Sequence, residues 1–260
     1  MAQPMTDLNS SRTLPRARRR AQRWPRWLKV IAALVVVVIL GAAGLGAARL
    51  LDRREFSSVT LAGPVDRIDL QVASGDVELV EGSDGDVTVQ RTSAWRLRPP
   101  DLVATVDGST ARIHATCPRV LVPLATCSVA HRIEVPEGVR VDVRTDAGTV
   151  SAEGLDGWVR IITSNGRVEA TDLASDELVV DTHGGDVQAW FTDAPSRVDV
   201  ATSGGDVELI LPEAPYEVSV RSDGGDVETR VETEELAERT IRVRSDGGSV
   251  AIDPPPRVPR

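Results

Sequence analysis

A twelve-residue pattern recurs along the chain and limits what it can fold into more than any other feature. Each copy is an alternating run of about five residues, a bend centred on glycine and a second short alternating run. The copies are IDLQVASGDVEL (68–79), VDVRTDAGTVSA (141–152), VRIITSNGRVEA (159–170), LVVDTHGGDVQA (178–189), VDVATSGGDVEL (198–209), VSVRSDGGDVET (218–229) and IRVRSDGGSVAI (241–252). Alternation of β-branched with polar residues indicates a half-buried strand, so each copy predicts strand, turn, strand.

Two positions of the pattern are the same in every copy. The eighth residue is glycine: Gly75, Gly148, Gly166, Gly185, Gly205, Gly225 and Gly248. The tenth residue is valine: Val77, Val150, Val168, Val187, Val207, Val227 and Val250. We expect the glycine to supply a positive φ at the bend, where the Asn, Asp or second Gly beside it suits the same turn.

The spacing of the repeat indicates how the copies are arranged. From Gly148 to Gly248 the shared glycines are 18, 19, 20, 20 and 23 residues apart. A period of about 20 residues is typical of stacked coils, in which no single repeat can bury its own apolar face. We therefore predict an all-β fold, a β-solenoid or single-stranded β-helix. One continuous inner stripe is expected from Val150, Val168, Val187, Val207 and Val227.

An antiparallel β-sandwich is the alternative, because Asp-Gly and Asn-Gly between alternating strands also signal hairpins. The only helix that the sequence suggests after residue 51 is a short one at 232–239.

The N-terminal part of the chain has a different character. Residues 30–48 read VIAALVVVVILGAAGLGAA, without a charge, and at about 1.5 Å per residue they are long enough to cross a bilayer core. We predict a transmembrane helix at 30–51. Residues 1–29 carry a charge of +7, which by the positive-inside rule places the N-terminus in the cytoplasm. A cleaved signal peptide is the alternative, and it would export the repeats equally.

These segments predict a single-pass protein of the cell membrane with its C-terminal domain outside. The expected parts are a disordered basic arm (1–29), the transmembrane helix (30–51), a linker (52–58), an extracytoplasmic β-repeat domain (59–252) and a disordered proline-rich tail (253–260). The chain carries −9 and the arm +7, which leaves −16 beyond residue 29. Such an acidic domain repels phosphate backbones, which argues against nucleic-acid binding.

The two cysteines, Cys117 and Cys127, bracket a short segment that interrupts the repeats. Outside the membrane we expect a disulfide, which would stabilise the fold by roughly 2–3 kcal/mol through the unfolded chain. The alternative is a Cys2His2 zinc site completed by His114 and His131, which flank the cysteines.

Polar residues also recur at the bends. Asp186, Asp206 and Asp226 each follow a turn glycine, and stacking would align them in one exposed row. We expect them to serve the turn, with calcium binding as the alternative. A hydroxyl residue precedes the bend in the six C-terminal copies: Thr145, Thr163, Thr182, Thr202, Ser222 and Ser245. These side chains suit turn capping or a ladder between coils, and ice or glycan binding is the alternative.

The tandem V-x-V-x-T-x-G-G-D-V-x-L units behind an N-terminal apolar segment resemble the bacterial "putative adhesin" β-strand-repeat family, over residues 59–252. The resemblance implies a right-handed β-helix or flattened β-solenoid in the cell envelope, with no catalytic residues. No catalytic constellation or cofactor motif is visible in the sequence itself.

We therefore expect a non-catalytic membrane-anchored envelope protein that presents its acidic repeat domain to another protein or a wall polymer, for binding or scaffolding. The alternatives are an accessory protein of envelope-stress signalling and a polysaccharide-acting β-helix enzyme.

Overall fold

The structure is a computed structural model of the 260-residue chain, and it describes residues 27, 30, 31, 34–39, 52–82, 85–118 and 126–256. Contacts divide the chain into two units, Met1–Leu50 and Leu51–Arg260. In the first unit residues 34–39 are helical, and among the described residues no helix is both long and apolar enough to cross a membrane. The remaining residues of the basic arm, of the predicted transmembrane segment and of the tail beyond 256 lie outside the described residues.

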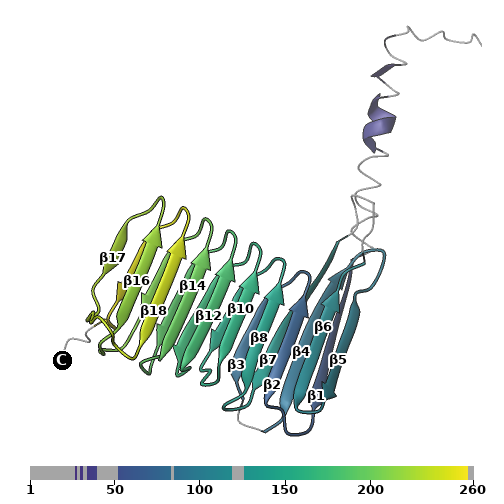
Figure 1. Ribbon diagram of the computed structural model, residues 1–260. Coiled ribbons are helices and arrows are strands. Elements are labelled where there is room, and N and C mark those ends of the chain that lie inside the picture. The colour runs from purple at the N-terminus through teal and green to yellow at the C-terminus, as the bar shows by residue number, and fades with distance from the viewer. Residues whose placement is uncertain are drawn as a thin grey trace, which may run out of the picture. The chain divides into compact units, whose positions relative to one another are not determined.

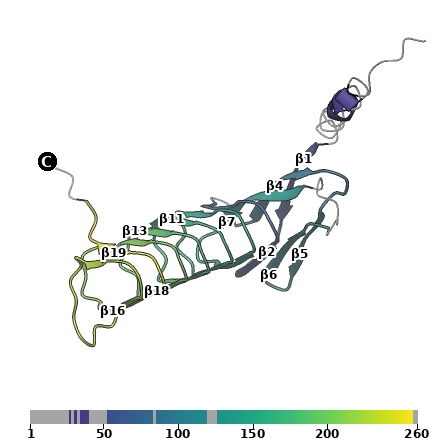
Figure 2. The same cartoon turned by 90° about the horizontal axis from the view of Figure 1, so that it is seen from above.

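The second unit consists of two facing β-sheets made of short strands (Figures 1 and 2). The strands are β1 (Arg53–Leu61), β2 (Arg67–Val72), β3 (Val77–Glu81), β4 (Val87–Trp95), β5 (Asp101–Asp107), β6 (Thr110–Thr116), β7 (Cys127–Val135), β8 (Arg140–Thr145), β9 (Val150–Glu153), β10 (Val159–Thr163), β11 (Val168–Leu173), β12 (Glu177–Thr182), β13 (Val187–Phe191), β14 (Arg197–Thr202), β15 (Val207–Ile210), β16 (Glu217–Ser222), β17 (Val227–Thr229), β18 (Thr240–Ser245) and β19 (Val250–Asp253).

Each repeat contributes one strand to each sheet, and the chain crosses between the sheets at the glycine bend. Sheet A has the order β1-β4-β7-β3-β9-β11-β13-β15-β19-β17, and sheet B has the order β16-β18-β14-β12-β10-β8-β2-β6-β5. Neighbouring repeat strands are parallel in both sheets. Since hairpins would make these pairs antiparallel, the solenoid prediction is confirmed and the sandwich alternative is wrong.

The order of the coils in the stack differs from their order in the sequence at the C-terminal end. The last coil, β18–β19, lies between β14–β15 and β16–β17. The inner stripe therefore runs from Val207 to Val250 and only then to Val227, so the predicted contact of Val207 with Val227 is wrong. Val227 is 50% exposed, whereas Val250 is 1% exposed.

A polar residue explains which coil lies outermost. The twelfth position of the repeat faces the core and is Leu, Ala or Ile in every copy except one, where it is Thr229. The last repeat has Ile252 there, with no exposed surface. Burying the more apolar coil inside the stack gains more from the hydrophobic effect. The longer connection at 230–239 permits this order, and it forms turns and a β-bridge between Tyr216 and Thr233, not the predicted helix.

At the N-terminal end the first repeat is also covered. Strands β2 and β3 lie between the coil β8–β9 and a diverged coil, β6–β7, which lacks the glycine bend. Strands β4, β1 and β5 then add antiparallel to its outer edges. The predicted linker at 52–58 is wrong from Arg53 onward, since β1 pairs with β4 along its whole length. Strand β1 carries few buried apolar residues, so its sequence lacks a strand signal, and pairing with β4 supplies its backbone hydrogen bonds.

Candidate binding surface

The hydroxyl row lies inside the stack, where it joins one coil to the next. The Oγ1 of Thr202 accepts a hydrogen bond from the Gly205 amide at 3.1 Å and donates one to the Gly185 carbonyl of the neighbouring coil at 3.3 Å. Thr182 and Ser245 repeat this arrangement, and both are 1% exposed. Buried hydroxyls bonded to backbone cannot meet an ice surface or a glycan, so the turn-capping role describes them.

The repeat glycines are needed for close stacking more than for a positive φ. Only Gly75 and Gly148 of the seven have a positive φ, so the expected conformational reason is wrong for the other five. A Cβ added at Gly205 would lie closer than 3.0 Å to the Gly185 carbonyl carbon and oxygen of the adjacent coil. The same clash between successive coils recurs along the row, so glycine is required because backbones touch there.

The aspartate row connects the coils on the outside of the bend. The Oδ1 of Asp186 accepts the Asp206 backbone amide at 3.1 Å, and the Oδ1 of Asp206 accepts the Ser249 amide at 2.8 Å. Asp226 lies on the outermost coil beside Ser249, not beside Asp206. Within the described residues, no group of three or more His, Cys, Asp or Glu side chains is placed to hold a metal ion. The carboxylates of Asp186 and Asp206 are thus engaged in the turns.

Cys117 and Cys127 are joined by a disulfide with a Cα–Cα distance of 5.8 Å. The bond closes the loop between β6 and β7, where the other coils have a glycine bend. His131 is 2% exposed and belongs to the inner row of β7, with its Nδ1 3.1 Å from the Val129 carbonyl oxygen. The bonded cysteines and this buried imidazole leave no Cys2His2 zinc site.

A buried basic pair that the sequence did not reveal continues the valine row at the N-terminal end. His131 pairs in register with Val77 on one side and with Arg91 of β4 on the other. Arg91 is 5% exposed, and its Nε and Nη2, like His131 Nε2, have no hydrogen-bond partner in the described part of the chain. Burial, and secondarily the Arg91 charge, lowers the pKa of His131 to about 4. The imidazole is therefore neutral near pH 7.

The outer face of sheet B carries a groove of about 400 Å³ near its C-terminal edge. Arg221 on β16 and Arg244 on β18 stand side by side in register, and Arg242 lies two residues before Arg244. The groove extends over β14, where the residue in register with Arg244 is the small Ala201. None of the three arginines makes an ion pair among the described residues, and all three are exposed.

Several arginines elsewhere on the same face are paired with carboxylates. Arg67 contacts the Asp142 carboxylate at 3.1 Å, and Arg144 contacts the same carboxylate at 2.9 Å. Asp199, which lies beside Arg242, is bonded to Arg197 of its own strand, with Nε to Oδ2 at 2.8 Å. Like charges in register on neighbouring strands repel each other. The arginine groove, defined as Arg221, Arg242, Arg244 and the surface between them, is therefore a site that an anion would complete.

The outer face of sheet A is acidic at the same end of the stack. A groove of about 460 Å³ is lined by Asp186, Asp206, Asp226, Glu208 and Glu228, among others. Its floor is formed where the inserted coil has Ser249 and Ala251 in place of an acidic pair. The two outer faces of the C-terminal coils thus differ in charge, and among the described residues of these coils the cations without ion pairs lie on the sheet B face.

Comparison with known proteins gives a family match and several similar structures. The family model described as Toastrack DUF4097 matches residues 68–253, a range that includes every copy of the repeat. The search of curated proteins gives no match. One similar solved structure is a "putative cell adhesion protein" from Clostridium sporogenes ATCC 15579, with 11% identity and a TM-score of 0.46, covering 78% of this chain and 100% of that one.

Two further structures are similar over a comparable share of the chain. A "putative adhesin" from Bacteroides fragilis NCTC 9343 has 14% identity and a TM-score of 0.47, over 78% of this chain and 97% of that one. A "putative lipid binding protein" from Parabacteroides distasonis ATCC 8503 has 12% identity and a TM-score of 0.36, over 76% and 96% of the two chains.

Proposed function

The chain belongs to the Toastrack DUF4097 family, and from that premise we propose that it is a non-catalytic, membrane-anchored binding protein of the bacterial cell envelope. Its repeat domain binds an anionic envelope component, carrying phosphate or carboxylate groups, in the arginine groove. The single observation that carries this proposal is the cluster of three exposed arginines that make no ion pair in the described part of the chain, on a face where Arg67, Arg144 and Arg197 are paired with carboxylates.

The chemistry of the guanidinium group supports an anionic partner. Arginine presents a planar fork of N–H donors that fits phosphate or carboxylate in a bidentate manner. Arg221 and Arg244 lie on adjacent parallel strands, about 4.8 Å apart at the backbone, so both can reach one anionic group. The rigid stack holds them in place before binding, which reduces the entropy lost on association.

The internal rows support a role in presentation without catalysis. The glycines that recur in every repeat, and the hydroxyls and aspartates that recur in most, are engaged in hydrogen bonds or close packing between coils, so their regularity serves the stack. What differs from coil to coil is the outer surface. Repeat proteins generally use such extended surfaces for binding.

The apolar segment 30–51 and the charge of the arm support the envelope location. Eight basic residues precede that segment, and Asp52 to Glu55 after it is balanced, which favours a cytoplasmic N-terminus. The repeat domain would then lie where disulfides persist, in agreement with the Cys117–Cys127 bond.

Binding to the groove is tested with the full chain in detergent and two anionic probes, purified cell-wall material and phosphatidylglycerol vesicles. Removing Arg242 and Arg244 by substitution with Ser is expected to weaken binding to one probe about tenfold or more, because hydrogen bonds to charged groups contribute about 1.5–3 kcal/mol each. The matched control is R112S/R167S, which removes two exposed arginines that have carboxylate partners. Equal weakening of binding in both double variants would mean that the loss of positive charge alone explains it, and would overturn the groove as the binding site.

The anchor is tested separately in intact cells. Single cysteines at Ser11 and Ser249 are labelled with a membrane-impermeant maleimide, in a background in which Cys117 and Cys127 are Ser. We expect label only at position 249, on a chain of full length. Label at position 11, or a shortened chain, would contradict the cytoplasmic N-terminus or the anchor.

A further inference from the structure

The capped end of the stack, where β1, β4 and β5 cover the first coils, has an exposed apolar side chain in a turn beside the start of β1. Strand β4 ends at Trp95, and the turn that follows begins with Arg96 and Leu97. Asp52, which immediately precedes β1, accepts a hydrogen bond from Arg96, with Nε and Oδ1 2.7 Å apart. Leu97 has a φ of 82° and is 52% exposed. The turn is thus fixed to the start of β1 and leaves this leucine in contact with solvent.

Three arginines at the same end make no ion pair among the described residues. They are Arg53, Arg54 and Arg98, and all three are exposed. Arg53 is in register with Trp95 at the end of β4, and Arg98 comes three residues after Trp95. The two stretches that meet here, 52–55 and 96–101, have a combined charge of +1, although the chain beyond residue 29 carries −16. This end is therefore weakly basic on an acidic domain.

The chain allows little distance between this end and a membrane. The apolar segment 30–51 ends two residues before Arg53, and two residues span at most about 7 Å. The headgroup layer on each side of a bilayer is roughly 5–8 Å thick. With that segment in the bilayer, Arg53 lies in the headgroup layer or directly above it. The bond between Asp52 and Arg96 keeps the leucine turn close to the same level.

We propose that this end of the domain docks on the phospholipid surface of the membrane that holds the anchor, an inference that rests on the anchor of the proposed function. Leu97 enters the boundary between headgroups and acyl chains, and the three arginines bind lipid phosphates. Guanidinium groups fit phosphate oxygens in a bidentate manner, and basic residues beside a membrane span are attracted to anionic lipid. Because an anionic surface repels the acidic remainder of the domain, it favours contact through the basic end.

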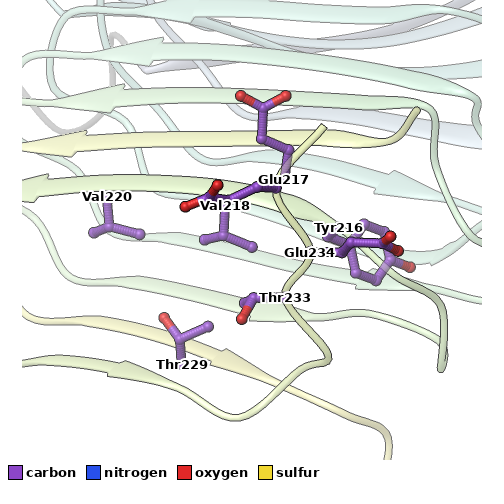
Figure 3. A pocket seen from close by; sticks show the side chains of 8 residues that line it. Tyr216, Glu217, Val218, Val220, Thr229, Thr233 and Glu234 are labelled. Carbon is purple, nitrogen blue, oxygen red and sulfur yellow. The ribbon is translucent and has the colours of Figure 1, made fainter. Parts of the chain in front are cut away.

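A second exposed leucine provides a contrast at the C-terminal, open end of the stack, where Val218 and Val220 face a hollow of about 370 Å³ (Figure 3). Leu236, in the connection that follows this coil, also has a positive φ, 69°, and is 91% exposed. Its neighbours in sequence are acidic, among them Glu235 and Glu238, whereas Leu97 lies between two arginines. Exposure and backbone conformation are thus shared by the two leucines, and the adjacent charge differs in sign.

Docking is tested with the full chain in vesicles made of equal parts of phosphatidylglycerol and phosphatidylcholine. The photoreactive residue benzoylphenylalanine replaces Leu97 in one variant and Leu236 in the other, and lipid adducts are measured by mass spectrometry after irradiation. We expect roughly tenfold more adduct at position 97, because that end is held at the lipid surface by its arginines. The comparison does not depend on the direction of insertion, since the domain always shares a side with the lipid surface next to it.

The arginines distinguish docking from the effect of the tether alone. The variant R53S/R54S/R98S is expected to lower the adduct at position 97 severalfold. The matched control R112S/R132S/R167S removes three exposed arginines that have carboxylate partners, and it should leave the adduct nearly unchanged. The groove variant R242S/R244S should also leave it nearly unchanged, so a failure of the groove is distinguishable from a failure of docking.

Equal adduct at positions 97 and 236 would overturn the proposal. An adduct at position 97 that persists without the three arginines would show that the tether alone brings the residue near lipid, and would overturn docking as well. Either result, with the chain still embedded after an alkaline carbonate wash, leaves the anchor standing. A chain that the wash removes from the vesicles would overturn the anchor and, with it, the docking.

Discussion

The two ends of the stack are finished in different ways. At the N-terminal end the coil β6–β7 is followed by β4 and β1 in sheet A and by β5 in sheet B, all of them antiparallel to the strand they cover. At the C-terminal end the coil β16–β17 is the last one, and within the described residues only the bridge at Tyr216 adds to its outer edge. The N-terminal end is therefore capped by added antiparallel strands of its own chain, and the C-terminal end has no such strands among the described residues.

This difference shows how a stack of nearly identical coils avoids continuing without limit. A parallel coil with free edges can accept another parallel coil, which favours aggregation. Strands that run the other way end the parallel pattern, as at β1 and β5. A polar inner residue lowers the hydrophobic stabilisation that a further coil would gain by stacking there. Each end of the stack has a coil with such a residue: Thr229 at the C-terminal end and His131, in the valine row, at the N-terminal end.

The largest expected difference between the interior of the stack and its open end comes from a methyl group at a repeat glycine. Gly205→Ala should destabilise the domain by about 3 kcal/mol, because its Cβ meets the fixed backbone of Gly185. The added Cβ in Gly225→Ala clashes with the Gly248 backbone in the same way, but the outermost coil can shift. We therefore expect roughly half the loss in free energy of unfolding. Urea unfolding measures both. The control is Gly204→Ala, where nothing lies within 4 Å, and a loss as large there would contradict the close-contact explanation.

Removal of the disulfide should loosen the capped end alone. The variant C117S/C127S is expected to lose about 2.5 kcal/mol, as the loop-entropy relation gives for a ten-residue separation. Hydrogen exchange followed by mass spectrometry should show faster exchange in β6 and β7 and unchanged exchange in β14 and β15. An equal increase at both places would mean that the two ends do not behave independently.

Acid should also weaken the capped end, through His131. Its pKa is about 4 in the folded protein and about 6.5 in the unfolded chain, so unfolding takes up a proton between these values and stability falls as the pH decreases from 6.5 to 4. The expected loss at pH 5 is about 2 kcal/mol, by linkage. His131→Val, which continues the row of Val77, should remove this dependence. If the variant loses the same stability between pH 7 and pH 5, another group is responsible.

The smallest expected effect separates the two valines at the open end. Val250→Ala should lower the free energy of unfolding by about 1.5 kcal/mol, because it removes two buried methyl groups. Val227→Ala should lower it by less than about half as much, because Val227 is 50% exposed. Urea unfolding of the two variants provides the comparison. The opposite ranking would indicate that the coils stack in sequence order.

The repeat made the architecture predictable, but not the order of the coils. Strand, bend and strand follow from alternation and glycine spacing, and the parallel sheets follow from the period. Any copy can pair with any other because their inner residues are alike, so the order depends on connection lengths and on single residues. The Thr229 exception was visible in the sequence and would have indicated the outermost coil.

The candidate site was harder to predict for a related reason. Arg221, Arg242 and Arg244 come from consecutive repeats, but the insertion of the last coil decides what lies beside them: β18 is next to β14, where Ala201 is in register with Arg244. No local motif marks them. Likewise, Arg91 and His131 are brought together by antiparallel pairing of β4 with β7, which the periodicity does not contain. By contrast, the turn aspartates and hydroxyls were visible because they repeat, and they serve the stack.

The most direct test of the account concerns the insertion of the last coil, since this order makes β16 the edge strand of sheet B and places β14 beside the arginines of β18. Glu208 is in register with Ala251 on the neighbouring strand, whereas Glu228 lies one strand farther away. Neighbouring parallel strands are about 4.8 Å apart, within disulfide range, and alternate strands are about twice as far apart. In the full chain, the pair E208C/A251C should form an internal disulfide under mild oxidation, as detected by mass spectrometry, and E208C/E228C should not. A bond between positions 208 and 228, with 208 and 251 remaining reduced, would show that the coils stack in sequence order and would contradict the account.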